Sequence, residues 1–449
     1  MGVQTPESSR DTLRCAQGVG VQASPEEAAR AACAEVRAAE LGRVHLAFVA
    51  ISAHHAEDAA RIAAIVRQEL TPDHLLGSTT DCVIVGVREL EHTPAVGVLA
   101  LRLPGVDIRP FGAGSFLSKT NEPTMVDECR TLIGASPVLR CSIVIVDPAS
   151  VPILSLLPAL NAARETGRDG RPAGVVVGGL AWTGDKNARN SLLLDDRVRH
   201  DGLVGVSLSG RLRVDAVVSQ GCRGFGPPMV VTRARANVIQ ELGGRPALDA
   251  VRDVLDTLNE RDRELVRTGL FVGCVVNEYK DRFGRGDYLI RNVAGVNPQS
   301  SSLMLHGLVR VGQTVQLHLR DAETAHEDLQ MLLNAQQLHG PPAGVLLATC
   351  TGRGRRLFPT PDHDALSIQR AFAEPPSGEE AAKGGVPIDP SRRPIPLVGF
   401  SAAGEIGPVG PDCHLHGHTA CALMFRAWPG IAPHDDPPRD RPDAPGRSA

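Results

Sequence analysis

One stretch near the C-terminus decides the fold: Gly399-Phe400-Ser401-Ala402-Ala403-Gly404-Glu405-Ile406-Gly407-Pro408. It follows an apolar run and predicts a strand that ends in small residues and a single carboxylate. Gly404 and Gly407 allow the backbone to approach a neighbouring group closely, because glycine has no Cβ. Glu405 then offers a hydrogen-bond acceptor, or an acid/base group, at the end of the strand.

Length and composition set the broad class. The chain has 449 residues, which is enough for two or three domains. Apolar residues make up 42% and charged residues 22%, as in soluble globular proteins. The formal net charge of −4 provides no basic field for nucleic acid. Aromatic residues are only 3%, so the core is expected to consist of Ala, Val, Leu and Ile.

Targeting signals and cysteine usage favour the cytoplasm. No apolar run has the length of a membrane-spanning helix, so membrane insertion is not expected. Residues 1–14 are polar and lack the apolar region of a secretory signal. The ten cysteines are scattered and contain no CxxC pair, which predicts buried thiols rather than disulfides.

The order of predicted elements indicates an α/β fold. Ser24 and Glu27 form a capping box, and Pro25 suits the first position of a helix. Strands and helices then alternate up to about residue 180, and short strands with polar turns follow. We predict a mixed α/β (α+β) protein of two sheet-based halves, with parallel and antiparallel strands and helices packed on the sheets. No internal repeat of fixed period is visible.

The predicted boundaries follow changes in composition. Residues 1–23 and 429–449 are expected to be disordered tails, and a Pro/Gly/charge-rich segment at 374–394 a mobile loop. The N-terminal half is placed at 24–220 and the C-terminal half at 221–428, divided at Gly221.

A second strand end carries arginines. Cys350 ends an apolar run, and Gly352, Arg353, Arg355 and Arg356 follow it. Glycines at a strand end free backbone N–H groups, and guanidinium groups suit carboxylate or phosphate. This pattern predicts an anion-recognition loop, and the alternative is a polar turn with solvated arginines. A nucleophilic Cys350 would need a neighbouring base and a lowered pKa, which the sequence cannot show.

Three further patterns remain open. Glu405 is either a partner for a cation, such as a ligand ammonium or an arginine of the loop above, or a turn glutamate that faces water. His414, His416 and His418 would share one face of a strand, as in a metal site, or are ordinary loop histidines. Arg291-Asn292 and Arg320-Asp321 place polar groups at strand ends, with Asp321 suited to cap a helix.

These segments together resemble FIST (F-box and intracellular signal transduction) proteins. The resemblance rests on Gly221-Cys222-Arg223 with Gly226-Pro227-Pro228, on Gly244-Arg245-Pro246-Ala247-Leu248, and on Gly404-Glu405-Ile406-Gly407-Pro408. In the N-terminal half it rests on Leu75-Leu76-Gly77-Ser78-Thr79 and Gly178-Gly179. It covers roughly residues 40–428, so 24–220 and 221–428 would be the N-terminal and C-terminal FIST-like domains.

The resemblance implies a sensory module in intracellular signal transduction. Such a protein would bind an amino-acid-like or other small polar metabolite without transforming it, and would signal through a downstream protein that the sequence does not identify. The predicted ligand-binding residues are Arg291, Asn292, Arg320, Cys350, Gly352, Arg353, Gly404, Glu405, His416 and Thr419, with Arg353 opposite Glu405. The alternatives are a haem-binding gas sensor with His416 as an axial ligand, and an enzyme that uses Cys350. Haem is the one cofactor that an alternative requires, and no residue is assigned to a metal ion.

Overall fold

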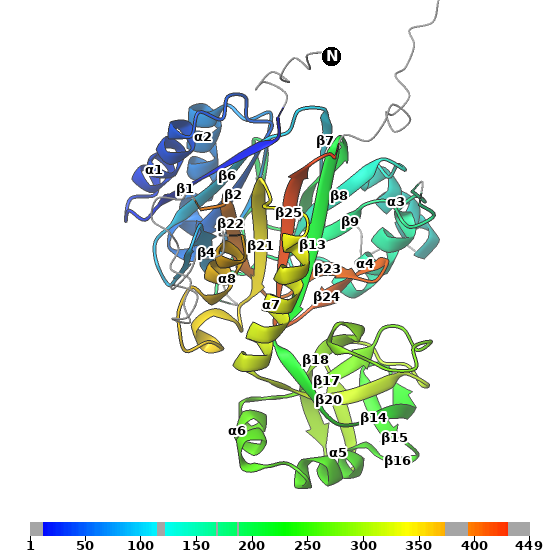
Figure 1. Ribbon diagram of the computed structural model, residues 1–449. Helices are drawn as coiled ribbons and strands as arrows, with labels where there is room; N and C mark the ends of the chain where they lie inside the picture. The colour runs from blue at the N-terminus through cyan, green and yellow to red at the C-terminus, as the bar shows by residue number, and fades with distance from the viewer. Residues whose placement is uncertain (1–11, 115–121, 168, 186–187, 373–393, 430–449) are drawn as a thin grey trace, which may run out of the picture.

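The computed structural model describes residues 12–114, 122–167, 169–185, 188–372 and 394–429. They form a main body of three six-stranded sheets and a smaller domain below it (Figure 1). The smaller domain, residues 222–320, is called the insert domain here because the main body continues on both sides of it. The predicted loop at 374–394 and the tail at 429–449 lie almost wholly outside the described residues.

The main body repeats one order of elements three times: strand, helix, strand, helix, strand, hairpin, closing strand. The first unit contains β1 (Arg14–Gly20), α1 (Pro25–Ala38), β2 (Leu46–Ser52), α2 (Ala59–Leu70), β3 (His74–Thr80), β4 (Cys82–Val85), β5 (Arg88–Glu91) and β6 (Val96–Arg102). The second contains β7 (Val106–Ala113), α3 (Glu122–Ile133), β8 (Leu139–Val146), α4 (Ile153–Ala163), β9 (Val175–Leu180), β10 (Leu192–Leu194), β11 (Arg197–Arg199) and β12 (Leu203–Gly210). The third contains β13 (Leu212–Gln220), α7 (Ala322–Gln337), β21 (Gly344–Cys350), α8 (His363–Ala371), β22 (Leu397–Ala402), β23 (Glu405–Val409), β24 (Asp412–His416) and β25 (Thr419–Ala427).

Each unit gives its hairpin to the sheet of another unit. The sheet orders are β1-β6-β2-β3-β10-β11, β7-β12-β8-β9-β23-β24 and β13-β25-β21-β22-β4-β5. One parallel pair lies in each sheet, namely β2–β3, β8–β9 and β21–β22, and the other neighbours are antiparallel. The hairpin β4–β5 therefore lies about 300 residues away in sequence from its neighbour β22, so the three units are bound together by backbone hydrogen bonds.

The inner faces of the three sheets meet in one core. Phe48 from the first sheet, Ile143 from the second and Phe400 from the third belong to the same apolar cluster. Phe48 and Phe400 stack with their ring centroids 5.6 Å apart. β2 is buried on both faces, and helices α1 and α2 pack against its outer side through another apolar cluster. This double burial explains why the strands of the main body are continuous apolar runs.

The insert domain is an antiparallel sheet that closes on itself. Its elements are β14 (Cys222–Arg235), β15 (Val238–Leu242), β16 (Arg245–Pro246), α5 (Ala247–Asp256), α6 (Glu260–Thr268), β17 (Leu270–Val275), β18 (Tyr288–Asn297), β19 (Ser302–Leu305) and β20 (Thr314–Arg320). β14 pairs with β20 in its first part and with β15 in its second part, which joins the two ends of the strand order. Its own apolar cluster fills the interior beneath α5.

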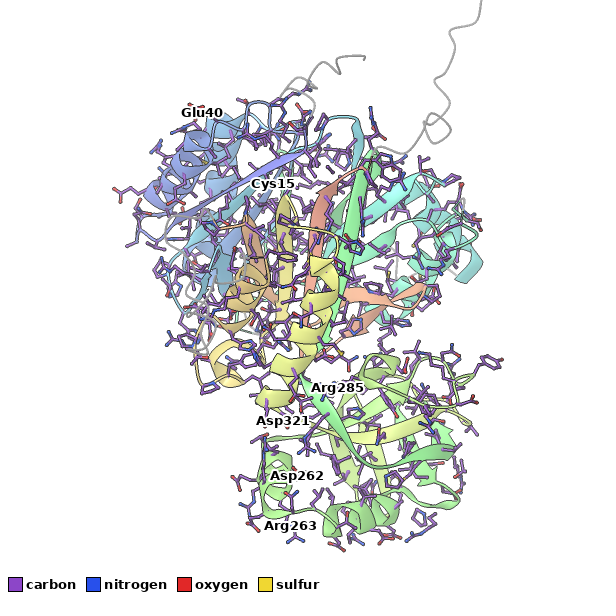
Figure 2. The ribbon with its side chains drawn as sticks, in the orientation of Figure 1. Cys15, Glu40, Asp262, Arg263, Arg285 and Asp321 are labelled. Atoms are coloured by element: carbon purple, nitrogen blue, oxygen red, sulfur yellow. The ribbon has the colours of Figure 1, made fainter. Side chains whose placement is uncertain are left out.

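The neck between the two bodies is held by charged groups. Asp321 caps α7 by accepting from the backbone N–H of Glu323 at 3.1 Å, and it receives Nε of Arg223 at 2.8 Å. Arg285 of the insert domain donates to Glu327 of α7 at 3.0 Å. Figure 2 shows Arg285 and Asp321 at this neck. The prediction that Asp321 caps a helix is confirmed.

The mixed α/β class and the first helix cap are confirmed, and one boundary is corrected. Ser24 accepts from the backbone N–H of Glu27, with Pro25 at the start of α1. Residues 14–20, expected in a disordered tail, form β1, paired along its whole length with β6. Ala16, Gly18 and Gly20 face the core there, and such small residues give little apolar signal in the sequence.

The structure qualifies the predicted division at Gly221 and the expected absence of an internal repeat. Gly221 does mark a transition, since the chain leaves β13 for β14 there, yet strands from both sides of it share sheets in the main body. The main body does contain a repeat that the sequence did not reveal, because the same order of strands and helices occurs three times along the chain. Among the described residues, no helix is long and apolar enough to cross a membrane.

Candidate functional site

Most of the predicted site residues meet where β21 and β22 end. The two strands are parallel, with Cys350 opposite Ala402, so their carboxyl ends share one edge of the sheet. The turn before β25 reaches the same edge. We call Cys350, Gly352, Arg353, Glu405, His418 and Thr419 the strand-end cluster. Its neighbours from the insert domain are Asn292 and Arg320, which contact His418 and Gly352 respectively.

Arg353 has a structural role that differs from the predicted one. Its Nε and Nη2 donate to the two carboxylate oxygens of Asp364 at 2.6 and 2.7 Å, and its Nη1 donates to the carbonyl of His418 at 3.3 Å. The side chains of Arg353 and Asp364 are 0% and 1% exposed. The guanidinium is therefore committed inside the protein, and the expectation that it takes the anionic end of a ligand is corrected.

Glu405 is also buried, but it is not ion-paired to Arg353. Its Oε2 accepts from the backbone N–H and the hydroxyl of Thr419 at 3.2 and 2.5 Å. Its Oε1 is buried and has no hydrogen-bond partner among the residues that the structure describes. Burial raises the pKa of Glu405 to about 8, so the carboxyl is largely neutral at pH 7. Gly404 beside it leaves room for Leu415, since a Cβ would lie 2.9 Å from that side chain.

Cys350 is enclosed and protonated. Burial, with the nearby carboxyl of Glu405 as a further cause, raises the pKa of its thiol to about 12. The backbone N–H of Gly352 lies 3.5 Å from the sulfur. A reactive cysteine needs the thiolate form and access to solvent, and this geometry favours neither. The structure therefore lends no support to Cys350 as a nucleophile.

The three clustered histidines do not converge on one point. His416 contacts the carbonyl of Gly407 through Nε2 at 3.0 Å, and His418 contacts the side chain of Asn292 through Nε2 at 3.0 Å. Burial lowers the pKa of each imidazole to about 4, so both are neutral at pH 7. One ring nitrogen of each of His414, His416 and His418 is buried and finds no hydrogen-bond partner in the described part of the chain. Within the described ranges, no three His, Cys, Asp or Glu side chains are grouped as metal ligands.

His416 does not fit the haem alternative. It is 3% exposed, and its Nε2 already contacts Gly407. It does not line either of the two pockets described below. An axial ligand must present a ring nitrogen to a cavity that holds the porphyrin, so we derive no role for haem at this residue.

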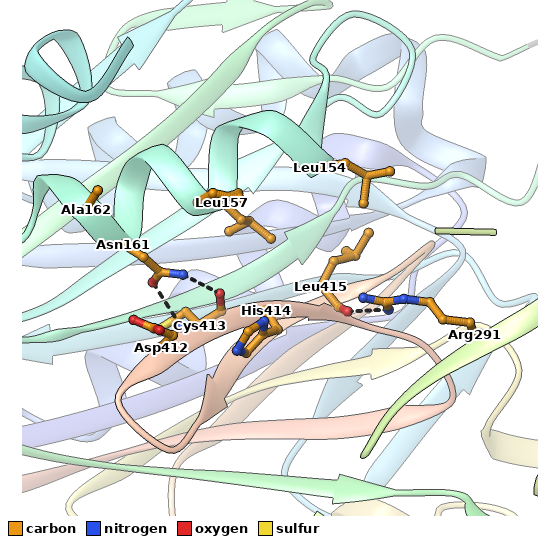
Figure 3. A pocket seen from close by; sticks show the side chains of 10 residues that line it. Leu154, Leu157, Asn161, Ala162, Arg291, Asp412, Cys413, His414 and Leu415 are labelled. Atoms are coloured by element: carbon orange, nitrogen blue, oxygen red, sulfur yellow. Dashed lines mark hydrogen bonds between the residues drawn. The ribbon is translucent and has the colours of Figure 1, made fainter. Parts of the chain in front are cut away.

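A surface pocket lies beside the strand-end cluster, between α4, the edge strand β24 and β18 (Figure 3). We call it the α4 pocket. Its volume is about 490 Å³, within the range of pockets that hold small molecules. It is lined by Leu154, Leu157, Pro158, Asn161, Ala162, Arg291, Asp412, Cys413, His414 and Leu415.

The rigid wall of the α4 pocket is built by Asn161. Its side-chain amide donates to the carbonyl of Cys413 at 2.8 Å, and its Oδ1 accepts from the N–H of Cys413 at 3.0 Å. This amide replaces a neighbouring strand at the exposed edge of β24, because it satisfies both backbone groups of one residue. Sequence reasoning missed Asn161, although a single amide in the apolar helix ILSLLPALNAA was a usable signal.

Opposite charges lie at the two ends of the α4 pocket. Arg291 donates to the carbonyl of Leu415 at 2.8 Å from one end, and Asp412 lies at the other (Figure 3). Asp412 is held by Nη2 of Arg164 at 3.2 Å, yet its side chain is 51% exposed. The guanidinium–carboxylate pair predicted for Arg353 and Glu405 thus has a counterpart in Arg291 and Asp412. Of these two residues, only Arg291 was predicted from the sequence as a site residue.

The predicted site residues accordingly fall into two neighbouring groups. Arg320 donates to the carbonyl of Gly352 at 3.1 Å, and Asn292 reaches His418, so both border the strand-end cluster. Arg291 instead lines the α4 pocket. The hairpin of β23 and β24 connects the two groups. Glu405 in β23 pairs with His416 at the end of β24, and the four preceding residues of β24 line the pocket. Whether any of these residues binds a ligand stays a prediction.

Comparison with protein-family profiles decides the identity of the family. The profile of the FIST N domain matches residues 45–245, and that of the FIST C domain matches residues 247–408. The chain belongs to the FIST family. The junction between the two profiles falls after β16, inside the insert domain, rather than at Gly221. FIST domains are associated with signal transduction and small-ligand sensing.

Several proteins are similar to this FIST chain over most of their length. An uncharacterized protein of Mycobacterium tuberculosis is 37% identical over 91% of this chain and 99% of its own length. An uncharacterized protein of Mycobacterium bovis is 35% identical over 91% of this chain and 98% of its own. Among solved structures, a cyanuric acid hydrolase from A. caulinodans aligns over 92% of this chain and 99% of its own, with 9% identity and a TM-score of 0.32. That score supports no statement about function.

Proposed function

We propose that this FIST protein is a sensory protein that binds a small zwitterionic metabolite, such as an amino acid, in the α4 pocket and does not transform it. The observation that carries the proposal is the placement of Arg291 and Asp412 at opposite ends of one pocket. A carboxylate would bind the guanidinium of Arg291, and an ammonium would bind the carboxylate of Asp412. The apolar side chain of Leu154, which is 45% exposed, would cover the rest of the ligand.

Arg291 suits the role of anion partner because its charge is not neutralised. Its guanidinium donates to the carbonyls of Ile290 and Leu415, and in the described part of the chain it makes no ion pair. Burial lowers the pKa of Arg291, which means that its surroundings disfavour the charge. A ligand carboxylate would supply the missing counter-charge, so the free energy of binding would include relief of this unfavourable burial.

The pocket also suggests how binding becomes a signal. Arg291 belongs to β18 of the insert domain, whereas Asp412 belongs to β24 of the main body. A ligand held at both ends would favour one orientation of the two bodies over others, since only a ligand with different affinities for two states shifts their populations. A downstream protein that contacts both bodies would then detect the ligand.

A ligand screen tests the proposal. Calorimetry or thermal shift with amino acids and related metabolites should give a hit whose affinity falls at least tenfold in Arg291→Ala, the loss expected for one charge-assisted contact. Arg310→Ala removes an exposed arginine of the same domain and serves as the matched control. Affinity that is equal in both variants, or a hit that survives unchanged in Arg291→Ala, would refute the α4 pocket as the site.

A further inference from the structure

A second pocket, distinct from the α4 pocket, is rich in arginine. Its volume is about 320 Å³, and its wall contains Arg140, Arg164, Arg171, Arg213, Asp169 and Trp428 together with small and apolar residues. We call it the arginine pocket. Four guanidinium groups face one carboxylate among the residues that line it.

The guanidinium groups come from separate elements and are held in place. Arg164 donates through Nη1 to Gly174 at 2.9 Å and through Nη2 to the carbonyl of Pro411 at 2.7 Å. Its side chain is 1% exposed, and its Nε is buried with no hydrogen-bond partner within the described ranges. Arg213 contacts Asp215 at 3.0 Å. Arg164 and Arg213 are therefore fixed in position, each with one carboxylate beside it, and an anion in the pocket would share these guanidinium groups with Asp412 and Asp215.

An aromatic platform completes the pocket. The guanidinium of Arg140 lies 4.0 Å from the ring centroid of Trp428, close enough for a cation–π contact, and its Nε donates to the carbonyl of Gly210 at 2.9 Å. Arg171 lies at the exposed rim, where its side chain makes no ion pair or hydrogen bond within the described residues. The rim thus holds one cation that can reorient toward a ligand.

We propose that the arginine pocket binds a small ligand that carries a phosphate or diphosphate group. Several guanidinium forks converge there, and a dianionic phosphate can accept from more than one fork at a time, whereas a single carboxylate is satisfied by one. The fixed groups Arg164 and Arg213 form the floor, and Arg171 closes over the ligand from the rim. The proposal does not depend on the α4 pocket.

The two pockets share one wall. The shared wall would couple the binding of a ligand in one pocket to binding in the other, and this coupling rests on the proposed function. Arg164 lines the arginine pocket, while its partner Asp412 lines the α4 pocket. An anion beside Arg164 competes with Asp412 for the guanidinium. Asp412 is then freer to bind the ammonium of a zwitterion, and by thermodynamic linkage each ligand should raise the affinity of the other.

The test uses inorganic pyrophosphate and the full chain. The chain has two tryptophans, so Trp182→Phe leaves Trp428 as the single fluorescent reporter in the pocket. Pyrophosphate should change its emission in a saturable manner, and Arg171→Ala should weaken binding about tenfold. Arg88→Ala, which removes an exposed arginine from β5, is the control for overall charge and should leave binding unchanged.

Two results would overturn the site. One is the absence of saturable binding of pyrophosphate by calorimetry. The other is equal weakening by Arg171→Ala and Arg88→Ala, because that would indicate nonspecific attraction. Arg291→Ala separates the two proposals: pyrophosphate binding should persist in it even if no zwitterion binds to the α4 pocket. Trp428→Phe, which retains an apolar ring, should remove the emission change while calorimetry still detects binding.

Discussion

Arg353 and Asp364 form a two-point ion pair from which water is excluded. The contacts are 2.6 and 2.7 Å, and neither side chain is more than 1% exposed. Asp364 also receives Nδ1 of His363 at 2.9 Å, and its backbone N–H donates to Glu89 at 2.8 Å. Because Glu89 lies on the hairpin contributed by the first unit, this pair joins the loop after β21 to a distant part of the sequence.

Breaking one side of this pair should be far more harmful than removing both. Asp364→Asn leaves Arg353 charged in a dry interior, and we expect a loss of about 3–5 kcal/mol in the free energy of unfolding. The double variant Arg353→Met/Asp364→Leu should lose less than the sum of the losses in the single variants Arg353→Met and Asp364→Leu. Urea denaturation of all three measures this. Additive losses would contradict the pair as a coupled unit.

Glu405 should make the protein less stable as the pH rises. Its pKa in the folded state, about 8, lies above that of an unfolded glutamate, so the folded state binds more protons between about pH 4.5 and 8. The stabilisation is complete below this window and is lost as pH rises through it. Glu405→Gln should remove roughly 2–4 kcal/mol of that dependence. Denaturation at pH 5 and pH 8 checks this, with the exposed Glu57→Gln as control; parallel pH profiles for wild type and Glu405→Gln would contradict it.

Asp412 should determine whether a ligand needs an amino group. If the α4 pocket binds a zwitterion, Asp412→Asn should weaken a hit from the amino-acid screen about tenfold and its desamino analogue less than twofold. The ratio of the two dissociation constants, measured by calorimetry, is the relevant quantity. An equal loss for both compounds would mean that Asp412 acts only through the structure of β24.

Gly18 should be intolerant of a side chain, because β1 is part of the core. A Cβ at this position would lie 1.9 Å from the carbonyl oxygen of Ala32 in α1. Gly18→Ala is expected to cost about 1–3 kcal/mol, as overpacking of a core does. Gly295→Ala is the matched control, since nothing lies within 4 Å of its added Cβ. Thermal denaturation should separate the two variants, and an unaffected Gly18→Ala would mean that β1 packs loosely.

The sequence was sufficient for most elements of the main body and insufficient for their assembly. The apolar runs and the caps at Ser24 and Asp321 follow local rules, and the structure confirms both caps. β1 was missed because its buried face consists of Ala16, Gly18 and Gly20, whose small side chains bury little apolar surface. The threefold order was hidden because the units differ in length and because the insert domain, residues 222–320, interrupts the third unit, so the chain has no repeated spacing.

The location of the site could be predicted from the sequence, but the pairing of its charged side chains could not. Strand ends that carry glycines and polar groups did gather around Cys350, as the edge of a parallel pair requires. The sequence could not show that Asp364, from α8, forms an ion pair with Arg353. Nothing in the sequence distinguished Asp412 as a site residue, since a carboxylate beside a turn is most often solvated.

The neck has a consequence for how such proteins can be altered. Cys222 pairs with Arg320, and the N–H of Asp321 donates to the carbonyl of Gly221, so the chain enters and leaves the lower body at nearly the same point. A cassette with adjacent ends can be removed, lengthened or transplanted without cutting a sheet of its host. Such a change would replace Arg291, at one end of the α4 pocket, and would leave Asp412, at the other end, in the host scaffold.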